Sequence, residues 1–169
     1  ACDQINAWSK EGLQPPVVSI NVSPIQLRHP DFVSVLEDCL RRHRIPHNSV
    51  CLELTENARM AHEDGRHIDL LNRLVALGVT LSIDDFGTGY SSLSYLHNLP
   101  VHEVKIDRMF IAGATHDARQ AQLYTGVVTL AASLGLDVVT EGIETSEELG
   151  LAVTSGSGLL QGLYLGRPV

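Results

Sequence analysis

The feature that most constrains this chain is a regular alternation of short β-branched segments with longer segments of helical period. The β-branched segments predict strands at 17–20, 50–54, 79–83, 103–106, 136–139 and 159–160. Apolar residues at helical spacing predict helices over 32–40, 68–75 and 123–134. Repeated strand, helix and strand units indicate an α/β fold on a parallel sheet, with strands buried on both faces.

Turn residues support this division of the chain. Gly78 and Gly135 follow two of the predicted helices and directly precede strands, where a left-handed residue ends a helix. The least regular segments are 86–100 and 154–158. No repeat or linker separates parts of the 169 residues, and 44% of them are hydrophobic, which predicts one globular domain over 1–169.

Charge and composition exclude several classes of function. The net charge of -8 opposes binding to DNA, RNA or an anionic membrane surface. No apolar run approaches the roughly 20 residues of a membrane span, and no secretion signal opens the chain, so we expect a cytoplasmic protein. Three cysteines without a C-x-x-C spacing, and eight scattered histidines, indicate neither disulfides nor a zinc site.

Polar residues collect at the C-terminal ends of the predicted strands. In chain order they are Asn21, Glu53, Glu56, Asp84, Asp85, Lys105, Asp107, Glu141, Glu144 and Gln161. One acidic residue after a strand is usually a helix cap, but the adjacent carboxylates of Asp84 and Asp85 repel unless a cation compensates. Lys105, within an apolar strand, needs acidic partners. Since ligands bind at this edge of parallel folds, we expect these side chains to share one site.

The donor types point to a chemistry. Oxygen ligands without His or Cys select a hard divalent ion, so Mg²⁺ or Mn²⁺ is expected. Several carboxylates can hold two such ions, an arrangement that activates water and clamps a phosphoryl group. Phosphoester hydrolysis is therefore the leading expectation from the residues alone.

Six motifs in order resemble the signature of EAL-domain cyclic di-GMP phosphodiesterases over nearly the whole chain. They are SINVS at 19–23, ELTE at 53–56, DDFGTGYSSL at 84–93, VKID at 104–107, EGIET at 141–145 and QG at 161–162. The resemblance implies a TIM-like (β/α) barrel with one antiparallel strand. It also implies a bacterial signalling enzyme that hydrolyses cyclic di-GMP to linear pGpG with two Mg²⁺ or Mn²⁺ ions.

The resemblance also implies roles for individual residues. The metal ligands would be Asn21, Glu53, Asp84, Asp85 and Glu141. Lys105 would orient the attacking water, with Asp107 beside it, and Glu141 would act as general base in a mechanism with a single metal ion. Glu56 would anchor the loop that starts at Phe86, while Glu144 and Gln161 would support the site or contact substrate. A homodimer and further signalling domains in the parent protein are implied as well.

The chain departs from the family pattern at its start. No Glu-Ala-Leu tripeptide occurs, so we expect an EAL domain over 1–169 that lacks its first strand and most of its first helix. The family's glutamate on that strand is a metal ligand. Two functions therefore stay open. One is a phosphodiesterase whose activity is assigned to the parent protein, with the activity of the fragment itself left open. The other is a non-catalytic module that binds cyclic di-GMP or a protein.

Overall fold

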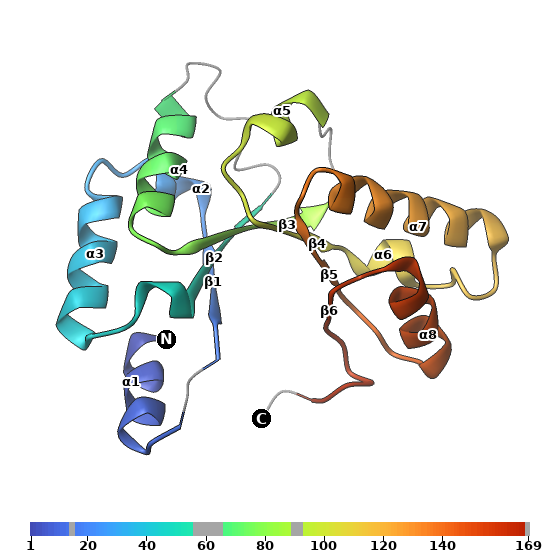
Figure 1. Ribbon diagram of the computed structural model, residues 1–169, viewed down its shortest axis with the longest axis horizontal. Helices are drawn as coiled ribbons and strands as arrows, with labels where there is room; N and C mark the ends of the chain where they lie inside the picture. Colours follow the sequence, from blue (N-terminus) through green and yellow to red (C-terminus); the bar gives the residue numbers. More distant parts are fainter. Residues whose placement is uncertain (14–15, 56–65, 89–92, 168–169) are drawn as a thin grey trace. The chain divides into compact units, whose positions relative to one another are not determined.

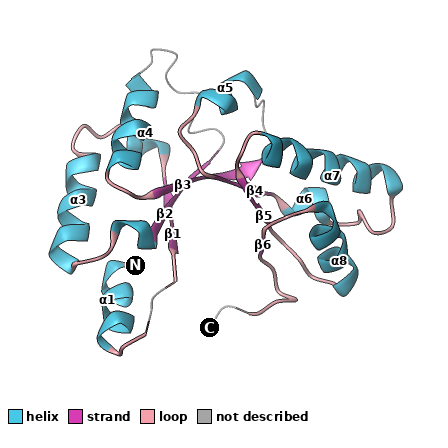
Figure 2. Cartoon of the chain, in the orientation of Figure 1, coloured by secondary structure: helices cyan, strands magenta, loops and turns pink. Residues whose placement is uncertain are grey.

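A computed structural model describes residues 1–13, 16–55, 66–88 and 93–167. Six strands form one sheet in the order β1-β2-β3-β4-β5-β6, and helices alternate with them along the chain (Figures 1 and 2). The strands are β1 (Val18–Val22), β2 (Val50–Thr55), β3 (Thr80–Phe86), β4 (Glu103–Ile106), β5 (Asp137–Thr140) and β6 (Leu159–Leu160). All six predicted strands are confirmed, which confirms the α/β class.

The helices are α1 (Cys2–Lys10), α2 (Pro24–Leu27), α3 (Phe32–His43), α4 (Arg66–Ala76), α5 (Leu93–Asn98), α6 (Arg108–Ile111), α7 (Ala118–Ser133) and α8 (Ser146–Ser155), with a 3₁₀ turn at His47–Ser49. None of the described helices is both long enough and apolar enough to cross a bilayer. The chain divides into two compact units, 1–82 and 83–169.

In the first unit, β1 and β2 pair in parallel, with Asn21 beside Glu53 in the register. The side chains of β2 from Val50 to Leu54 are all buried, as expected for a strand covered on both faces. Helix α1 meets α3 where the Sγ atoms of Cys2 and Cys39 lie 3.6 Å apart as free thiols. Burial raises the pKa of the Cys2 thiol, and its contact with Cys39 raises it further.

In the second unit, β4, β5 and β6 pair in parallel. The hydroxyl of Tyr124 on α7 lies 2.6 Å from that of Thr140 at the end of β5. Thr140 in turn donates to the hydroxyl of Ser157 at 2.9 Å. This chain of hydroxyls ties α7 to the strand that leads directly into Glu141.

Replacing Tyr124 by Phe tests this hydroxyl network. We expect a loss of about 1–2 kcal/mol in the free energy of unfolding, because a buried hydrogen bond disappears. Burial raises the pKa of Tyr124 above its ordinary value of 10.0. The unfolded chain therefore releases this proton first, so the wild type should lose stability as the pH rises above 10.0, and the variant should lose less.

Denaturation at neutral and alkaline pH measures both effects. Tyr164, whose side chain is 51% exposed, provides the matched control, and Tyr164→Phe should change stability by less than about 0.5 kcal/mol. Equal midpoints for the two variants would contradict the role given to Tyr124.

Three expectations about the elements are corrected. Strands β1 and β6 are not buried on both faces, because they lie at the edges of the described sheet and expose Ser19, Asn21 and Leu159. The supposedly irregular segment 86–100 contains α5, and α8 extends into 154–158 before Gly156, at φ 90°, ends it. Helix α8 begins with a capping box between Thr145 and Glu148, a sequence signal that predicts a helix start.

Candidate active site

Two of the predicted metal ligands lie side by side in the first unit. Asn21 and Glu53 are register partners near the C-terminal ends of β1 and β2. The Glu53 side chain is buried, while Asn21 is exposed. A buried carboxylate is costly unless charges or hydrogen bonds compensate it, so this glutamate is more than a solvated loop residue.

Asp84 and Asp85 lie near the C-terminal end of β3, just before Phe86, in the second unit. Asp84 Oδ1 accepts a hydrogen bond from the Asp85 backbone N–H at 3.0 Å. Asp85 has a φ of 55°, a left-handed conformation that few residues other than glycine, asparagine and aspartate adopt. Thr88 holds this turn, because both its N–H and its hydroxyl donate to the Asp85 carbonyl. The backbone therefore turns sharply between the two carboxylates.

Lys105 on β4 is buried and meets two acidic partners. Its Nζ lies 2.5 Å from Glu141 Oε1 and 3.7 Å from Asp84 Oδ1. All three side chains are at most 20% exposed, so water screens these charges poorly. The expectation that this lysine needs acidic partners is confirmed, and three predicted site residues come together here.

Glu141 also borders a cavity of about 700 Å³ within the second unit. The cavity lies at the ends of β5 and β6 and combines charged and apolar side chains. Its lining includes Arg108, Glu141, Glu144, Leu160, Gln161, Leu163, Leu165 and Arg167. The cavity therefore offers charged groups and apolar surface to a bound molecule.

Glu144 and Gln161 line this cavity in different ways. The Glu144 carboxylate forms an ion pair with Arg108 at 2.8 Å. The Gln161 backbone bonds to Thr140 on one side and to Ile143 on the other, which fixes its position beside Glu141.

Asp107 has a structural task. Its Oδ1 accepts a hydrogen bond from the Met109 N–H at 2.7 Å, so Asp107 is the N-cap of α6. Capping a helix is the usual role of an acidic residue that follows a strand. Asp107 is not among the described residues that line the cavity. Glu56 lies outside the described residues.

The donor set suits a hard cation. Within the part of the chain that the structure describes, no three His, Cys, Asp or Glu side chains converge as a metal site. Yet Asp84 and Glu141 already face one positive group, the Lys105 ammonium, and all the predicted ligands offer oxygen. Oxygen donors of this kind fit Mg²⁺ or Mn²⁺ rather than zinc.

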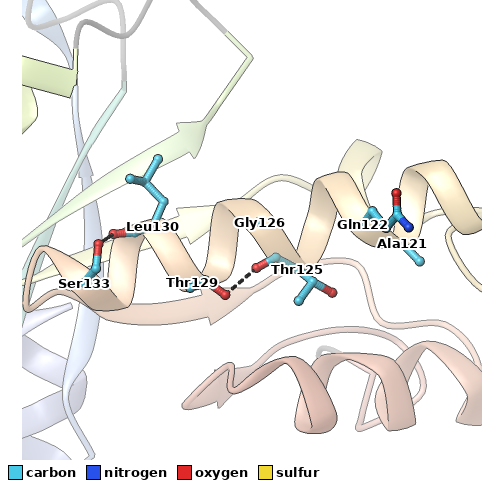
Figure 3. A pocket seen from close by; sticks show the side chains of 7 residues that line it. All are labelled: Ala121, Gln122, Thr125, Gly126, Thr129, Leu130 and Ser133. Atoms are coloured by element: carbon cyan, nitrogen blue, oxygen red, sulfur yellow. Dashed lines mark hydrogen bonds between the residues drawn. The ribbon is translucent and has the colours of Figure 1, made fainter.

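A second hollow, of about 670 Å³, runs along one face of α7 (Figure 3). Its lining is Ala121, Gln122, Thr125, Gly126, Thr129, Leu130 and Ser133. These side chains include no acid or base, and the threonine and serine hydroxyls of Thr129 and Ser133 donate to the backbone of their own helix. The cavity beside Glu141 is therefore the better candidate for catalysis.

Replacing Asp85 separates its chemical role from its backbone role. Asn tolerates a left-handed φ, so Asp85→Asn should keep the fold and, if the carboxylate binds metal, lose more than about 100-fold in turnover. Asp85→Val should lose activity and about 1–3 kcal/mol of stability, because a β-branched residue is strained there. Kinetics and thermal unfolding of both variants test this, and a folded Asp85→Asn with full rate would remove Asp85 from the site.

Two cavity residues escape prediction from the sequence. Arg108 follows Asp107 and resembles a surface residue at the start of a helix, and Arg167 lies in a C-terminal segment without periodicity. The one local signal for Arg108 is its place directly after a strand end, where the other site residues also occur.

Comparison with known families gives a match over nearly the whole chain. The family model described as EAL domain matches residues 1–168. The bifunctional diguanylate cyclase/cyclic di-GMP phosphodiesterase MucR of Pseudomonas aeruginosa is 40% identical over 169 residues, which cover 100% of this chain and 24% of that protein. The signaling protein YkoW of Bacillus subtilis is 34% identical, with 100% and 21% covered. The chain thus spans less than a quarter of the length of these two relatives.

Solved structures agree with this match. The MucR phosphodiesterase in complex with c-di-GMP superposes with a TM-score of 0.92 at 39% identity, covering 100% of this chain and 68% of that one. The EAL domain of Mycobacterium smegmatis DcpA gives 0.91 at 36% identity, covering 100% and 76%. These likenesses confirm the TIM-like barrel class of the sheet and helices described above.

Proposed function

This chain belongs to the EAL domain family of c-di-GMP phosphodiesterases, and we propose that, within its whole protein, it hydrolyses cyclic di-GMP to linear pGpG with Mg²⁺ or Mn²⁺. The observation that carries the proposal is the buried ammonium of Lys105 between Glu141 and Asp84. Glu141 also borders the cavity that Arg167 lines, so acid–base groups adjoin a space with a cation for a phosphate.

The proposed metal ligands are Asn21, Glu53, Asp84, Asp85 and Glu141. When bound, two divalent ions supply Lewis acidity to the phosphoryl oxygens and to the attacking water. Lys105 donates hydrogen bonds that orient this water, and Glu141 accepts its proton as general base. Asp107 supports the site through the turn between β4 and α6.

The reaction adds one water across one P–O bond of the cyclic substrate. The attacking oxygen joins phosphorus, its proton goes to Glu141, and the departing sugar oxygen leaves as a hydroxyl after it gains a proton. One phosphate stays in the internucleotide linkage and the other becomes the terminal phosphate of pGpG. Arg167 and Gln161 line the space beside Glu141, where they can contact the substrate.

The proposal extends to the setting of the enzyme. Both relatives are much longer than this chain, which supports further domains in the parent protein. We propose that the enzyme acts in the bacterial cytoplasm and that it forms a homodimer. We also propose that the family's first strand and its glutamate precede Ala1, and that Glu56 anchors the loop after β3.

Product analysis tests the function. The full-length protein, incubated with cyclic di-GMP and Mg²⁺ or Mn²⁺, should release pGpG, and EDTA should stop the release because the proposed ligands hold the catalytic ions. Chromatography measures the product, and excess Mg²⁺ after EDTA should restore it.

Two outcomes would count against catalysis. Turnover that ignores EDTA would refute the metal-dependent mechanism. Tight calorimetric binding of cyclic di-GMP without metal and without product would instead favour the non-catalytic module.

A further inference from the structure

Arg108 and Glu144 form a two-pronged ion pair at the edge of the cavity. Arg108 Nη1 lies 2.8 Å from Glu144 Oε1, and Nη2 donates to Oε2 at 2.8 Å. The planar guanidinium matches the carboxylate at both ends, which fixes the relative orientation of the two groups. The pair joins the first residue of α6 to the segment that follows β5.

The segment that carries Glu141 is held on several sides. Gly142 has a φ of 71°, and a Cβ atom there would overlap the aliphatic stem of Arg108, so the stem lies directly against the backbone. Ile143 donates its N–H to the Gln161 carbonyl at 3.0 Å. Glu148 accepts the N–H of Glu144 at 2.8 Å. Arg108 provides the clamp on the side of α6.

We infer that Arg108 is a positioning residue. Its ion pair with Glu144 and the packing of its stem against Gly142 fix the backbone segment that places Glu141 against Lys105. The expected effect of Arg108 on turnover rests on the proposed function. Its expected effect on the rigidity of segment 141–144 does not. Glu141 N–H already bonds to the Ile106 carbonyl at 3.1 Å, so β4 and β5 hold one end of the segment. Arg108 holds the other end, three residues further along.

The geometry distinguishes this role from a direct grip on substrate. Both terminal nitrogens of Arg108 face the Glu144 oxygens, so the guanidinium charge is already balanced by a carboxylate. Arg167 lines the same cavity, and no ion pair involves it among the described residues. A phosphate would therefore meet Arg167 at a lower cost than it would meet Arg108.

Hydrogen exchange tests the clamp without any need for activity. In the full-length protein, Arg108→Ala should speed exchange of the Ile143 and Glu144 amides about three- to tenfold, a modest factor because the pair is partly exposed. Arg119→Ala is the matched control, since Arg119 is an exposed arginine on α7 outside the cavity. Equal exchange in wild type and Arg108→Ala would overturn the inference.

Steady-state kinetics tests the consequence for the reaction. Arg108→Ala should lower kcat roughly ten- to hundredfold with KM within about twofold, because misplacement of Glu141 affects the chemical step. Arg108→Lys keeps the positive charge and can make one of the two hydrogen bonds to Glu144. Its kcat should therefore lie between those of wild type and Arg108→Ala. Arg119→Ala should match wild type.

A double-mutant cycle shows whether Arg108 acts through its partner. Arg108→Ala combined with Glu144→Gln should be no slower than the slower single variant. Multiplied losses, or a raised KM at unchanged kcat, would overturn the inference in favour of a direct substrate contact. Wild type without pGpG production would refute the proposed function, while the exchange result would still decide whether Arg108 holds the segment.

Discussion

Replacing Lys105 by Met should lower kcat by about 10²–10³-fold, the range for loss of one hydrogen-bond donor at the reacting centre. The same change should cost about 3–5 kcal/mol of stability in EDTA, because Asp84 and Glu141 would keep their negative charges without the cation between them. Methionine nearly matches the lysine stem in length, so the packing of the buried stem is largely preserved.

Divalent cations should change the stability of this variant in a diagnostic way. If Asp84 and Glu141 are metal ligands, Mg²⁺ or Mn²⁺ would balance the two carboxylates in place of the ammonium and recover part of the lost stability. The shift in Tm between EDTA and Mg²⁺ should then be larger for Lys105→Met than for wild type. Activity should not recover, because a divalent ion cannot replace the hydrogen bonds that orient the attacking water.

Lys10 is the matched control, since it is the other lysine of the chain and lies exposed at the end of α1. Lys10→Met should change the stability by less than about 0.5 kcal/mol and leave kcat unaltered. Wild-type turnover in a folded Lys105→Met protein would remove Lys105 from the catalytic residues. An equal response of both variants to Mg²⁺ would contradict the expectation that the ion takes over the charge balance of Asp84 and Glu141 from the Lys105 ammonium.

The strands and the convergence at Lys105 could be predicted from the sequence because both follow from short-range patterns. A run of β-branched residues specifies a strand locally, and parallel pairing brings the ends of neighbouring strands to one edge. Lys105 is a charge within an apolar run. Of its partners, Asp84 lies near the end of β3 and Glu141 directly follows β5, and these are the two strands adjacent to β4. The physical cost of a buried ammonium was sufficient to predict acidic neighbours.

The clamp on the segment after β5 could not be predicted in this way. Arg108 and Glu144 are 36 residues apart in the sequence. Both are charged residue types that are common on protein surfaces. Whether an exposed arginine pairs with a particular glutamate depends on where the start of α6 meets the segment after β5, and hydrophobic periodicity does not encode this. Asp107 differs from Arg108 in this respect. The sequence pattern predicts a role for Asp107 in the chemistry of the site, and the structure shows that its side chain caps α6.

Replacing Gly162 by Ala should lower the stability more than a Gly→Ala change at any other glycine between β5 and the C-terminal end of the described chain. A Cβ at Gly162 would coincide with the backbone of Ile143, whose N–H and carbonyl are both bonded to the 161–164 segment. Backbone held by hydrogen bonds on both sides cannot yield as a flexible side chain can. We expect a loss of about 3 kcal/mol or more, at the upper end of the cost of overpacking.

The damage should reach the active site, because Ile143 lies two residues after Glu141 and Gln161 adjoins the substitution. Urea unfolding should show a lower midpoint for Gly162→Ala, and kcat should fall with it. Gly150→Ala is the matched control: it lies within α8, where a Cβ meets nothing within 4 Å, and should gain about 0.5–1 kcal/mol. If both variants shifted the midpoint equally, the close approach of Gly162 to the Ile143 backbone would be contradicted.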